Sequence, residues 1–320
     1  MKIFLTGGSG FVGGAAVKAL SGRHSMIALS RSERSDAVLK ASGASPVRGD
    51  LGTVKADMLR GANAVIHAAA FVEEWGPWSA YQAVNVAGTK RLLTAAKDAG
   101  VRRFVHVGTE AALFHGQHMR DIDETYPLAP NSPFPYSATK ARAEALVVGA
   151  NDPANGFETI VIRPRLVWGE GDKTVLPVVK AMAEAGRFAW IDGGRAMTST
   201  THIDNLVAAL DLALTNGKAG EAYFVVDCPP VMFRDFLGPY LKSAGVDLPG
   251  KSVPGALVRS IANIAEPLFR IARSSSPPPI TRFVAHIMSR DCTINDARAR
   301  AELGYQPVIT RTDGLARLAA

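Results

Sequence analysis

Short apolar runs alternate with stretches of helical periodicity along the first half of the chain. The runs are almost wholly apolar, which is typical of parallel strands that helices cover on both faces. The helical stretches between them include 80–99 and 135–148. The strands that we expect are Ile3–Leu5, Met26–Leu29, Ala64–His67, Phe104–Val107 and Thr159–Ile162. The pattern therefore predicts an α/β fold built on a doubly wound parallel sheet.

The alternation becomes less regular after about Arg163, and a run of serines and prolines at 274–279 interrupts the last part of the chain. We therefore expect a large sheet domain over 1–228 and a smaller C-terminal domain over 229–320. Residues 167–193 are expected to contribute to the ligand side of the sheet domain.

The 320 residues are 47% hydrophobic and 20% charged, which suits a folded globular chain and excludes wholesale disorder. Cys228 and Cys292 are too few for a disulfide framework and lack the spacing of metal ligands, so we expect no metal site. The amino terminus enters the first predicted strand without a signal sequence. No apolar run approaches the ~20 residues of a membrane span, and we expect a cytoplasmic protein.

The formal net charge is +7, and the segment 249–290 carries six basic residues against the single acidic residue Glu266. These basic residues are spaced along an apolar segment and do not cluster with aromatic residues, so we do not expect nucleic-acid binding. Residues 256–273 predict an amphipathic helix that bends at Pro267. Its apolar stripe consists of Leu257, Ile261, Ile264, Leu268 and Ile271. We expect the stripe to lie in the core above a ligand cleft; the alternative is a lid or a membrane-surface contact.

Three glycines at intervals of three follow the first predicted strand and precede the helix 15–20. Glycine lets the backbone approach a phosphate, and a helix N-terminus is positively polarised. A glycine-rich turn can also occur without a ligand. At the first strand–turn–helix of an alternating chain it indicates dinucleotide binding in a Rossmann fold. The contacts that we expect are Thr6, Gly7, Gly10, Phe11, Val12 and Gly13.

The end of the second predicted strand indicates which dinucleotide binds. NAD sites usually place an acidic residue there to bind the ribose hydroxyls, but residues 28–32 contain none. Arg31 could pair with a 2′-phosphate, although it could also be a solvated loop residue. We therefore expect NADP(H) to be favoured over NAD(H).

Tyr136 and Lys140 lie one helical turn apart in the predicted helix 135–148. A phenol has a pKa of about 10, and a nearby ammonium group lowers that pKa, so the pair could exchange protons. Thr109 follows the strand 104–107, at the carboxyl edge where ligands bind in open α/β sheets. Its hydroxyl could orient a carbonyl oxygen beside Tyr136. Together with the glycine loop, these residues predict a hydride-transfer site.

At these residues the chain resembles the extended short-chain dehydrogenase/reductase family. Within that family it is most similar to the 3β-hydroxysteroid dehydrogenase-like branch, which includes 2-alkyl-3-oxoalkanoate reductases. The stretches that carry this likeness are 75–78, 163–169, 199–205 and 280–283.

The resemblance implies that Tyr136 exchanges a proton with the substrate oxygen and that Lys140 lowers the tyrosine pKa and holds the nicotinamide ribose. It also implies that Thr109 polarises the substrate oxygen and that Asn85 completes a proton relay through water. Further cofactor contacts would be Asp50, Leu51, Ala68, Ala69, Lys140 and Pro164. Trp75, Trp78 and Trp168 would contact the substrate, together with Thr109.

Two departures from the family pattern affect the expected substrate. Thr109 stands where the family most often has serine, and it keeps the hydroxyl. Thr198 and Ser199 stand where sugar-nucleotide epimerases usually carry arginine and aspartate, which counts against a diphosphate substrate.

We therefore expect an NAD(P)-dependent oxidoreductase that interconverts a secondary alcohol and a ketone on a small apolar molecule, which is sterol-like, 3-oxoacyl-like or terpenoid. The C-terminal domain would bind that substrate. One alternative is an epimerase or isomerase with a tightly bound cofactor; another is a dinucleotide-sensing protein without catalysis. The resemblance also implies a homodimer formed through the long helices of the sheet domain.

Overall fold

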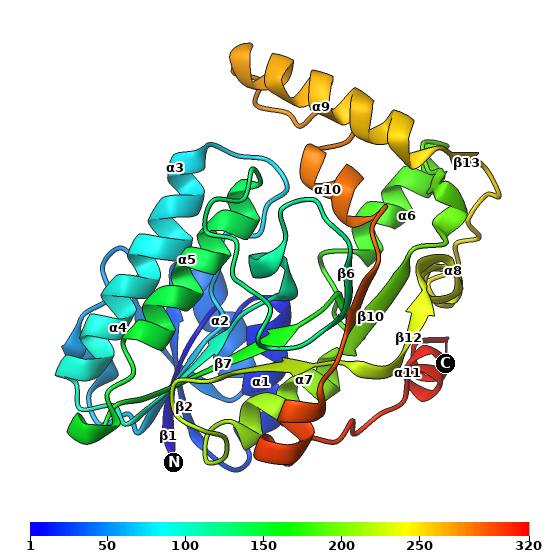
Figure 1. The fold of residues 1–320 in the computed structure, drawn as a ribbon. Coiled ribbons are helices and arrows are strands. Elements are labelled where there is room, and N and C mark those ends of the chain that lie inside the picture. The colour runs from blue at the N-terminus through cyan, green and yellow to red at the C-terminus, as the bar shows by residue number, and fades with distance from the viewer. Residues whose placement is uncertain (320) are drawn as a thin grey trace.

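The computed structural model describes residues 1–319 apart from the side chain of Cys228, so the expectation for that cysteine lies outside the described residues. At its centre lies a sheet of seven parallel strands in the order β11-β7-β5-β4-β1-β2-β3 (Figure 1). The predicted doubly wound sheet is confirmed, and all five expected strands belong to it. Its strands are β1 (Lys2–Thr6), β2 (Ser25–Ser30), β3 (Ala44–Arg48), β4 (Ala64–His67), β5 (Arg103–Val107), β7 (Glu158–Pro164) and β11 (Ala222–Val225).

The two strands that the pattern missed are the two edges of the sheet. β3 contains Pro46, which has no N–H to donate to a ladder and is tolerated at an edge. β11 has only four residues and lies in the less regular part of the chain. β3 therefore lacks the continuous apolar run that a central parallel strand needs.

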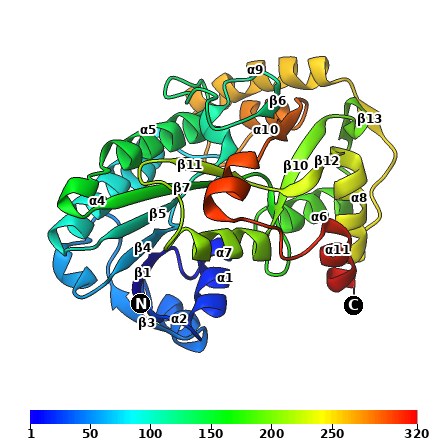
Figure 2. The same ribbon diagram turned by 60° about the horizontal axis from the view of Figure 1, so that its bottom comes forward.

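Successive residues of β1 point into two different cores. Ile3 and Leu5 pack among helices on one face of the sheet, and Phe4 packs among helices on the other. Figure 2 shows the two helical layers on opposite sides of the strands. One layer holds α1 (Phe11–Leu20), α2 (Glu33–Ala41) and α7 (Ile203–Leu212), and the other holds α4 (Thr89–Asp98) and α5 (Pro135–Gly149).

A second, smaller sheet lies beside the first and is assembled from distant parts of the chain. Its strands are β12 (Asp227–Met232), β10 (Met197–His202), β14 (Cys292–Ile294), β6 (Met119–Ile122) and β8 (Val167–Trp168). Because these strands come from both sides of residue 228, the division of the chain at that residue stays a prediction. The remaining helices and strands are α3 (Trp78–Tyr81), α6 (Leu176–Glu184), α8 (Phe233–Ser243), α9 (Gly255–Ile271), α10 (Arg282–Ile287), α11 (Arg311–Ala319), β9 (Trp190–Ile191) and β13 (Ser252–Val253). Short 3-10 and π-helical turns are η1 (Ala56–Leu59), η2 (Gln82–Gly88), η3 (Glu110–Leu113), η4 (Pro153–Asn155), η5 (Asp192–Gly194) and η6 (Ala299–Leu303).

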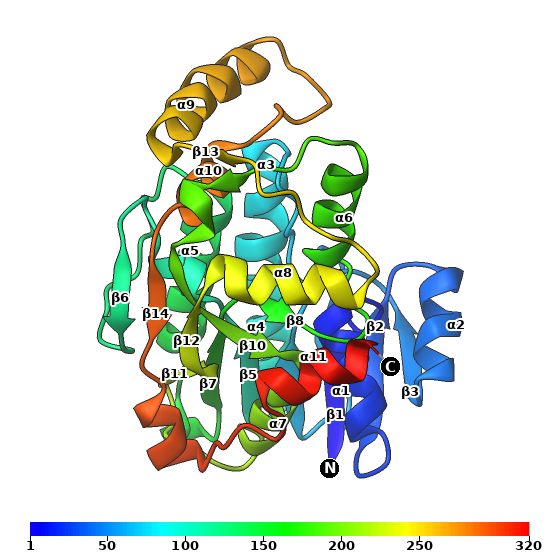
Figure 3. The ribbon, with the colours of Figure 1, turned by 90° about the vertical axis from the view of Figure 1, so that its right-hand side faces the viewer.

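Helix α9 lies at one end of the molecule, away from the amino terminus (Figures 1 and 3). The expectation that its apolar stripe is buried is wrong, because all five stripe residues are between 50% and 79% exposed. The opposite face of the helix is buried instead, and it carries Gly255, Ala262 and Glu266. Among the described residues, no helix is long and apolar enough to cross a membrane.

Candidate active site

The glycine loop joins β1 to α1 at the carboxyl edge of the large sheet. Gly7 has a left-handed backbone (φ +79°), and a Cβ there would lie 2.8 Å from the backbone of Ala68 and Ala69. A Cβ on Gly13 would lie 2.3 Å from the Gly7 carbonyl oxygen. The loop is further tied to the segment after β4 because the Thr6 hydroxyl accepts from the Ala69 amide at 3.2 Å. The two glycines therefore leave room that any side chain would fill.

The amino terminus of α1 suits a phosphate group. Helix α1 begins at Phe11, with Gly10 as its N-cap residue. Among the described residues, no side chain caps this end of the helix, and its first turn contains no acidic residue. Its first backbone N–H groups are therefore open to an anion, which the helix dipole also favours. Val12, the remaining expected contact in this loop, lies in the same first turn.

Three of the expected cofactor contacts, Arg31, Asp50 and Leu51, lie at the carboxyl ends of β2 and β3. Arg31 directly follows β2, is exposed, and forms no ion pair with any residue that the structure describes. The Asp50 carboxylate accepts from the Gly52 amide at 2.8 Å and from the Thr53 hydroxyl at 3.0 Å, which shapes the turn that begins after β3. Leu51 is buried in that turn. The fold thus brings Arg31, Asp50 and Leu51 to one edge of the sheet, and Pro164 ends β7 at the same edge.

Helix α5 carries the tyrosine and the lysine. Lys140 is buried, and its ammonium donates to the Val107 carbonyl at 2.8 Å and lies 3.4 Å from His106 Nε2. Burial lowers the pKa of Lys140 to about 8, while the nearby Glu144 carboxylate acts in the opposite direction. The Lys140 ammonium thus contacts β5.

Thr109, the residue that precedes η3, lies beside the Tyr136 hydroxyl. Burial, and next the Glu110 carboxylate, raise the pKa of Tyr136 above its ordinary value. The neighbouring Thr109 side chain acts in the opposite direction and lowers the pKa of Tyr136. The structure therefore brings Thr109 and Tyr136 together, and their roles in catalysis stay a prediction.

Sequence reasoning missed a buried ion pair directly behind Thr109. The Thr109 hydroxyl donates to Glu110 Oε2 at 2.9 Å, and the other oxygen of that carboxylate pairs with Arg165. Both charged side chains are buried. The available signals were an acidic residue next to Thr109 and a basic residue shortly after β7, but their pairing depends on the fold.

Asn85 lies in the π-helical turn η2. Its amide oxygen accepts from the Phe71 N–H at 2.7 Å, and its amide nitrogen donates to the Phe71 carbonyl at 3.2 Å and to the Thr139 hydroxyl at 3.1 Å. These bonds fasten the segment after β4 to α5. A role for Asn85 in a proton relay through water stays a prediction.

The three tryptophans expected near the substrate have different surroundings. Trp75 donates its indole N–H to the Ser274 carbonyl at 3.0 Å, and the Arg270 guanidinium lies 4.4 Å from its ring. The loop after β4 therefore contacts the end of α9. Trp78 is 41% exposed and lies below the Arg142 guanidinium.

Trp168 is fully buried, packs edge-on against His202 and Phe236, and donates to Asp227 at 2.7 Å. This packing corrects the expectation that Trp168 contacts substrate. Trp168 lies in the core beside the smaller sheet, because its neighbours come from β10, β12 and α8.

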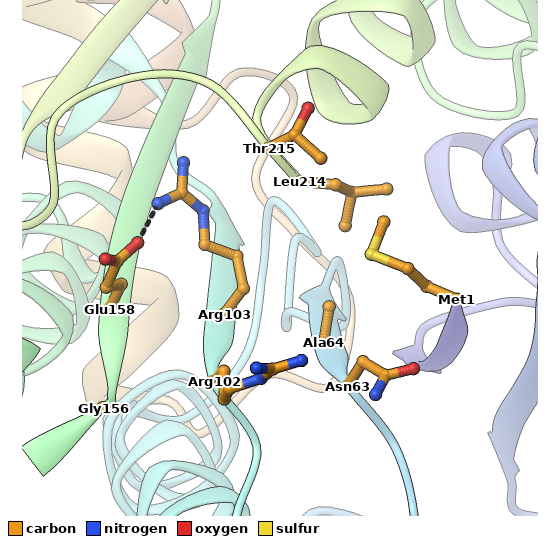
Figure 4. A pocket seen from close by; sticks show the side chains of 9 residues that line it. All are labelled: Met1, Asn63, Ala64, Arg102, Arg103, Gly156, Glu158, Leu214 and Thr215. Atoms are coloured by element: carbon orange, nitrogen blue, oxygen red, sulfur yellow. Dashed lines mark hydrogen bonds and ion pairs between the residues drawn. The ribbon is translucent and has the colours of Figure 1, made fainter.

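A cavity lies at the opposite, amino edge of the large sheet (Figure 4). Met1, Asn63 and Arg102, which line it, each lie just before a central strand, and Arg103 pairs with Glu158 beside them. Because ligands of open α/β sheets bind at the carboxyl ends of the strands, this cavity is not the candidate active site. Among the described residues, no group of His, Cys, Asp or Glu could hold a metal ion.

A family model described as the 3-beta hydroxysteroid dehydrogenase/isomerase family matches residues 4–254. The chain belongs to this family. It is 40% identical to a 4-hydroxy-2-methyl-3-oxo-4-farnesyl-3,4-dihydroquinoline-1-oxide ketoreductase from Stigmatella aurantiaca, over 98% of this chain and 95% of that protein. It is 34% identical to a 2-alkyl-3-oxoalkanoate reductase from Stenotrophomonas maltophilia, over 100% and 99%.

A solved dTDP-glucose 4,6-dehydratase from Streptomyces venezuelae, with NAD bound, has a TM-score of 0.74 and 25% identity over 100% of this chain and 96% of that one. The fold is thus that of the extended short-chain dehydrogenases/reductases. The protein is an oxidoreductase that uses a nicotinamide dinucleotide, as predicted, and the reductases among its relatives favour this activity over the epimerase and sensor alternatives.

Proposed function

We propose that the protein interconverts a secondary alcohol and a ketone on an apolar molecule, with Tyr136 exchanging the proton and Thr109 orienting the oxygen. The observation that carries the proposal is that Thr109 lies beside the Tyr136 hydroxyl at the carboxyl edge of the sheet, where β5 ends. The Stigmatella and Stenotrophomonas relatives act on molecules whose names include a farnesyl and an alkyl group, which supports an apolar substrate.

The residues around the glycine loop fit a dinucleotide, because Gly7 and Gly13 leave space against the backbone and the α1 amides are open. The bound dinucleotide supplies or accepts the hydride. In reduction, Tyr136 gives its proton to the carbonyl oxygen, and in oxidation it takes the proton from the alcohol. Lys140 would leave the Val107 carbonyl to hold the nicotinamide ribose, and its positive charge would then favour the phenolate when oxidation requires it.

We also propose that NADP(H) is preferred over NAD(H). Arg31 is exposed at the end of β2 and has no ion-pair partner among the described residues, so its guanidinium is available to a 2′-phosphate. Replacing Arg31 with serine should weaken NADPH binding by about tenfold or more and leave NADH binding nearly unchanged, because hydrogen bonds to charged groups contribute about 1.5–3 kcal/mol.

Fluorescence titration of the purified protein with each dinucleotide measures this preference. Arg60→Ser is the matched control, because Arg60 is an exposed arginine paired only at the surface with Asp57. Tighter binding of NADH than of NADPH by the wild-type protein would discard Arg31 as a phosphate partner.

We further propose that α9 contacts the surface of an anionic membrane through its exposed stripe. Five large apolar side chains face outward on one helix, and the surrounding segment 249–290 is strongly basic. This combination suits a bilayer interface that carries negative charge. The contact of α9 with Trp75 places that interface next to the loop after β4, where an apolar substrate could enter from the lipid.

Flotation with phosphatidylglycerol vesicles tests this proposal. The wild-type protein should float with these vesicles and bind phosphatidylcholine vesicles less, and Ile264→Asp should lower flotation at least about fivefold because a charge would enter the apolar interface. Val308→Asp, at a residue that is 64% exposed and lies outside α9, is the control. Absence of flotation would overturn the proposal, and concentration-dependent dimerisation that Ile264→Asp abolishes would assign the stripe to a second copy of the chain.

A further inference from the structure

Glu266 lies on the buried face of α9, and the proton transfer described above does not use it. It is the only acidic residue in the basic segment 249–290, and its side chain is 8% exposed. Helix α9 lies across the end of the molecule that is uppermost in Figure 1, with α10 below it. Since a buried carboxylate needs hydrogen-bond partners, the contacts of Glu266 show which segments it holds.

One oxygen of the Glu266 carboxylate fastens α10 to α9. Its Oε2 accepts from the backbone N–H of Arg282, the first residue of α10, at 2.7 Å. The Arg282 guanidinium in turn donates from Nε to the Asn263 amide oxygen in α9 at 3.0 Å. The next residue, Phe283, packs edge-on against Tyr136, with 5.8 Å between the ring centroids. Glu266 thus holds the helix that places an aromatic side chain against the proposed proton donor.

The other oxygen fastens the loop after β4, residues 68–77. Its Oε1 accepts from Arg270 Nε at 3.1 Å and from Arg270 Nη2 at 2.9 Å. The same guanidinium donates from Nη1 to the Gly76 carbonyl at 3.3 Å and lies 4.4 Å from the Trp75 ring. Because a guanidinium has five donors in a planar fork, Arg270 can hold the carboxylate and the loop at once.

These contacts exceed what an ion pair within one helix provides. Glu266 and Arg270 lie four residues apart, and an ion pair at that spacing stabilises a helix only slightly. This pair also binds the backbone of α10 and of the loop after β4, both of which lie outside α9. The carboxylate therefore joins two segments that are distant in the sequence, one directly and the other through an arginine.

We propose that Glu266 is a positioning residue that clamps two walls of the candidate site together. Through α10 it seats Phe283 against Tyr136, and through Arg270 it holds the loop after β4 to α9. The clamp keeps an apolar substrate against fixed aromatic side chains and away from water. The inference rests on the proposed role of Tyr136.

Three variants separate the two arms of the clamp in a steady-state assay with NADPH and 2-undecanone, an apolar ketone. Phe283→Leu removes the ring against Tyr136 and should lower kcat about tenfold, since a misplaced catalytic group loses rate. Arg270→Met frees the loop after β4 and should raise KM about fivefold with kcat within about twofold, since loop closure retains the substrate. Glu266→Gln keeps the shape and removes the charge, so it should show both effects.

Hydrogen–deuterium exchange of the same variants without substrate measures the clamp independently of activity. In Glu266→Gln, exchange in 68–77 and in 282–287 should rise together by about tenfold, because each segment opens more easily once the carboxylate no longer joins them. Arg270→Met should raise exchange in the loop after β4 but not in α10, and Phe283→Leu should do the reverse. A role confined to helix stability would raise exchange in α9 alone.

Glu124→Gln and Arg102→Met are the controls. Glu124 is another buried carboxylate, which accepts from the Phe224 amide at 2.8 Å, and Arg102 is exposed at the opposite edge of the sheet. Both variants should keep the wild-type kcat, KM and exchange. Unchanged exchange in Glu266→Gln, or raised exchange with wild-type kcat and KM, would overturn the inference. Should Glu266→Gln fail to fold, wild-type behaviour of Arg270→Met and Phe283→Leu would overturn it.

Failure of the proposed function gives a different result. If Tyr136→Phe is inactive with 2-undecanone while Glu266→Gln matches the wild-type protein, the clamp is wrong and the proposed function stands. If Tyr136→Phe keeps most of its activity, the proposed function fails, and the positioning role of Glu266 fails with it.

Discussion

Tyr136→Phe should lower kcat by about a thousandfold and leave the dissociation constant for the dinucleotide within about twofold, since general acid–base catalysis contributes about 10²–10⁴ in rate. The substitution removes one hydroxyl, which lies beside Thr109, and leaves the ring that packs against Phe283. The measurement is the change in nicotinamide absorbance with an apolar ketone, combined with a fluorescence titration of cofactor binding.

Tyr126→Phe is the control for this variant. Tyr126 is a partly buried tyrosine whose hydroxyl accepts from Gln117 at 3.3 Å, outside the candidate site. Its activity should stay near that of the wild-type protein. Retention of most activity by Tyr136→Phe would remove Tyr136 from the mechanism and, with it, the proposed proton transfer.

Gly13→Ala should destabilise the fold by about 2 kcal/mol and weaken dinucleotide binding at least about tenfold, because overpacking a tight site typically costs about 1–3 kcal/mol. A Cβ at this position would lie 2.3 Å from the Gly7 carbonyl oxygen and 2.6 Å from the Gly7 carbonyl carbon. Both are backbone atoms that cannot move aside without displacing the loop. Since the same loop would hold the pyrophosphate, stability and affinity should fall together.

Urea denaturation and the fluorescence titration measure these two losses. Gly149→Ala is the matched control, because Gly149 ends α5 and a Cβ there would meet nothing within 4 Å. Its stability should change by less than about 0.5 kcal/mol. If Gly13→Ala binds the dinucleotide with wild-type affinity, dinucleotide binding does not depend on the close approach of Gly13 to Gly7.

The central sheet and the main parts of the site could be predicted because their signals are local. A central parallel strand is buried on both faces and therefore reads as an apolar run, which identified five of the seven strands. The glycine triplet and the spacing of Tyr136 and Lys140 each lie within a single turn or helix. The edge strand β3 lacked such a signal because it contains proline, and β11 was missed because it lies in the less regular part of the chain.

The sequence by itself determined the sheet, the dinucleotide loop and the residues able to exchange a proton. Only the tertiary structure decided that Trp168 is buried, that the stripe of α9 faces outward and that Glu110 meets Arg165 behind Thr109. Periodicity shows that a helix has an apolar face but not which face the rest of the chain covers. A charged residue likewise has no readable partner when that partner lies 55 positions away, because the pairing arises only when β7 is placed beside β5.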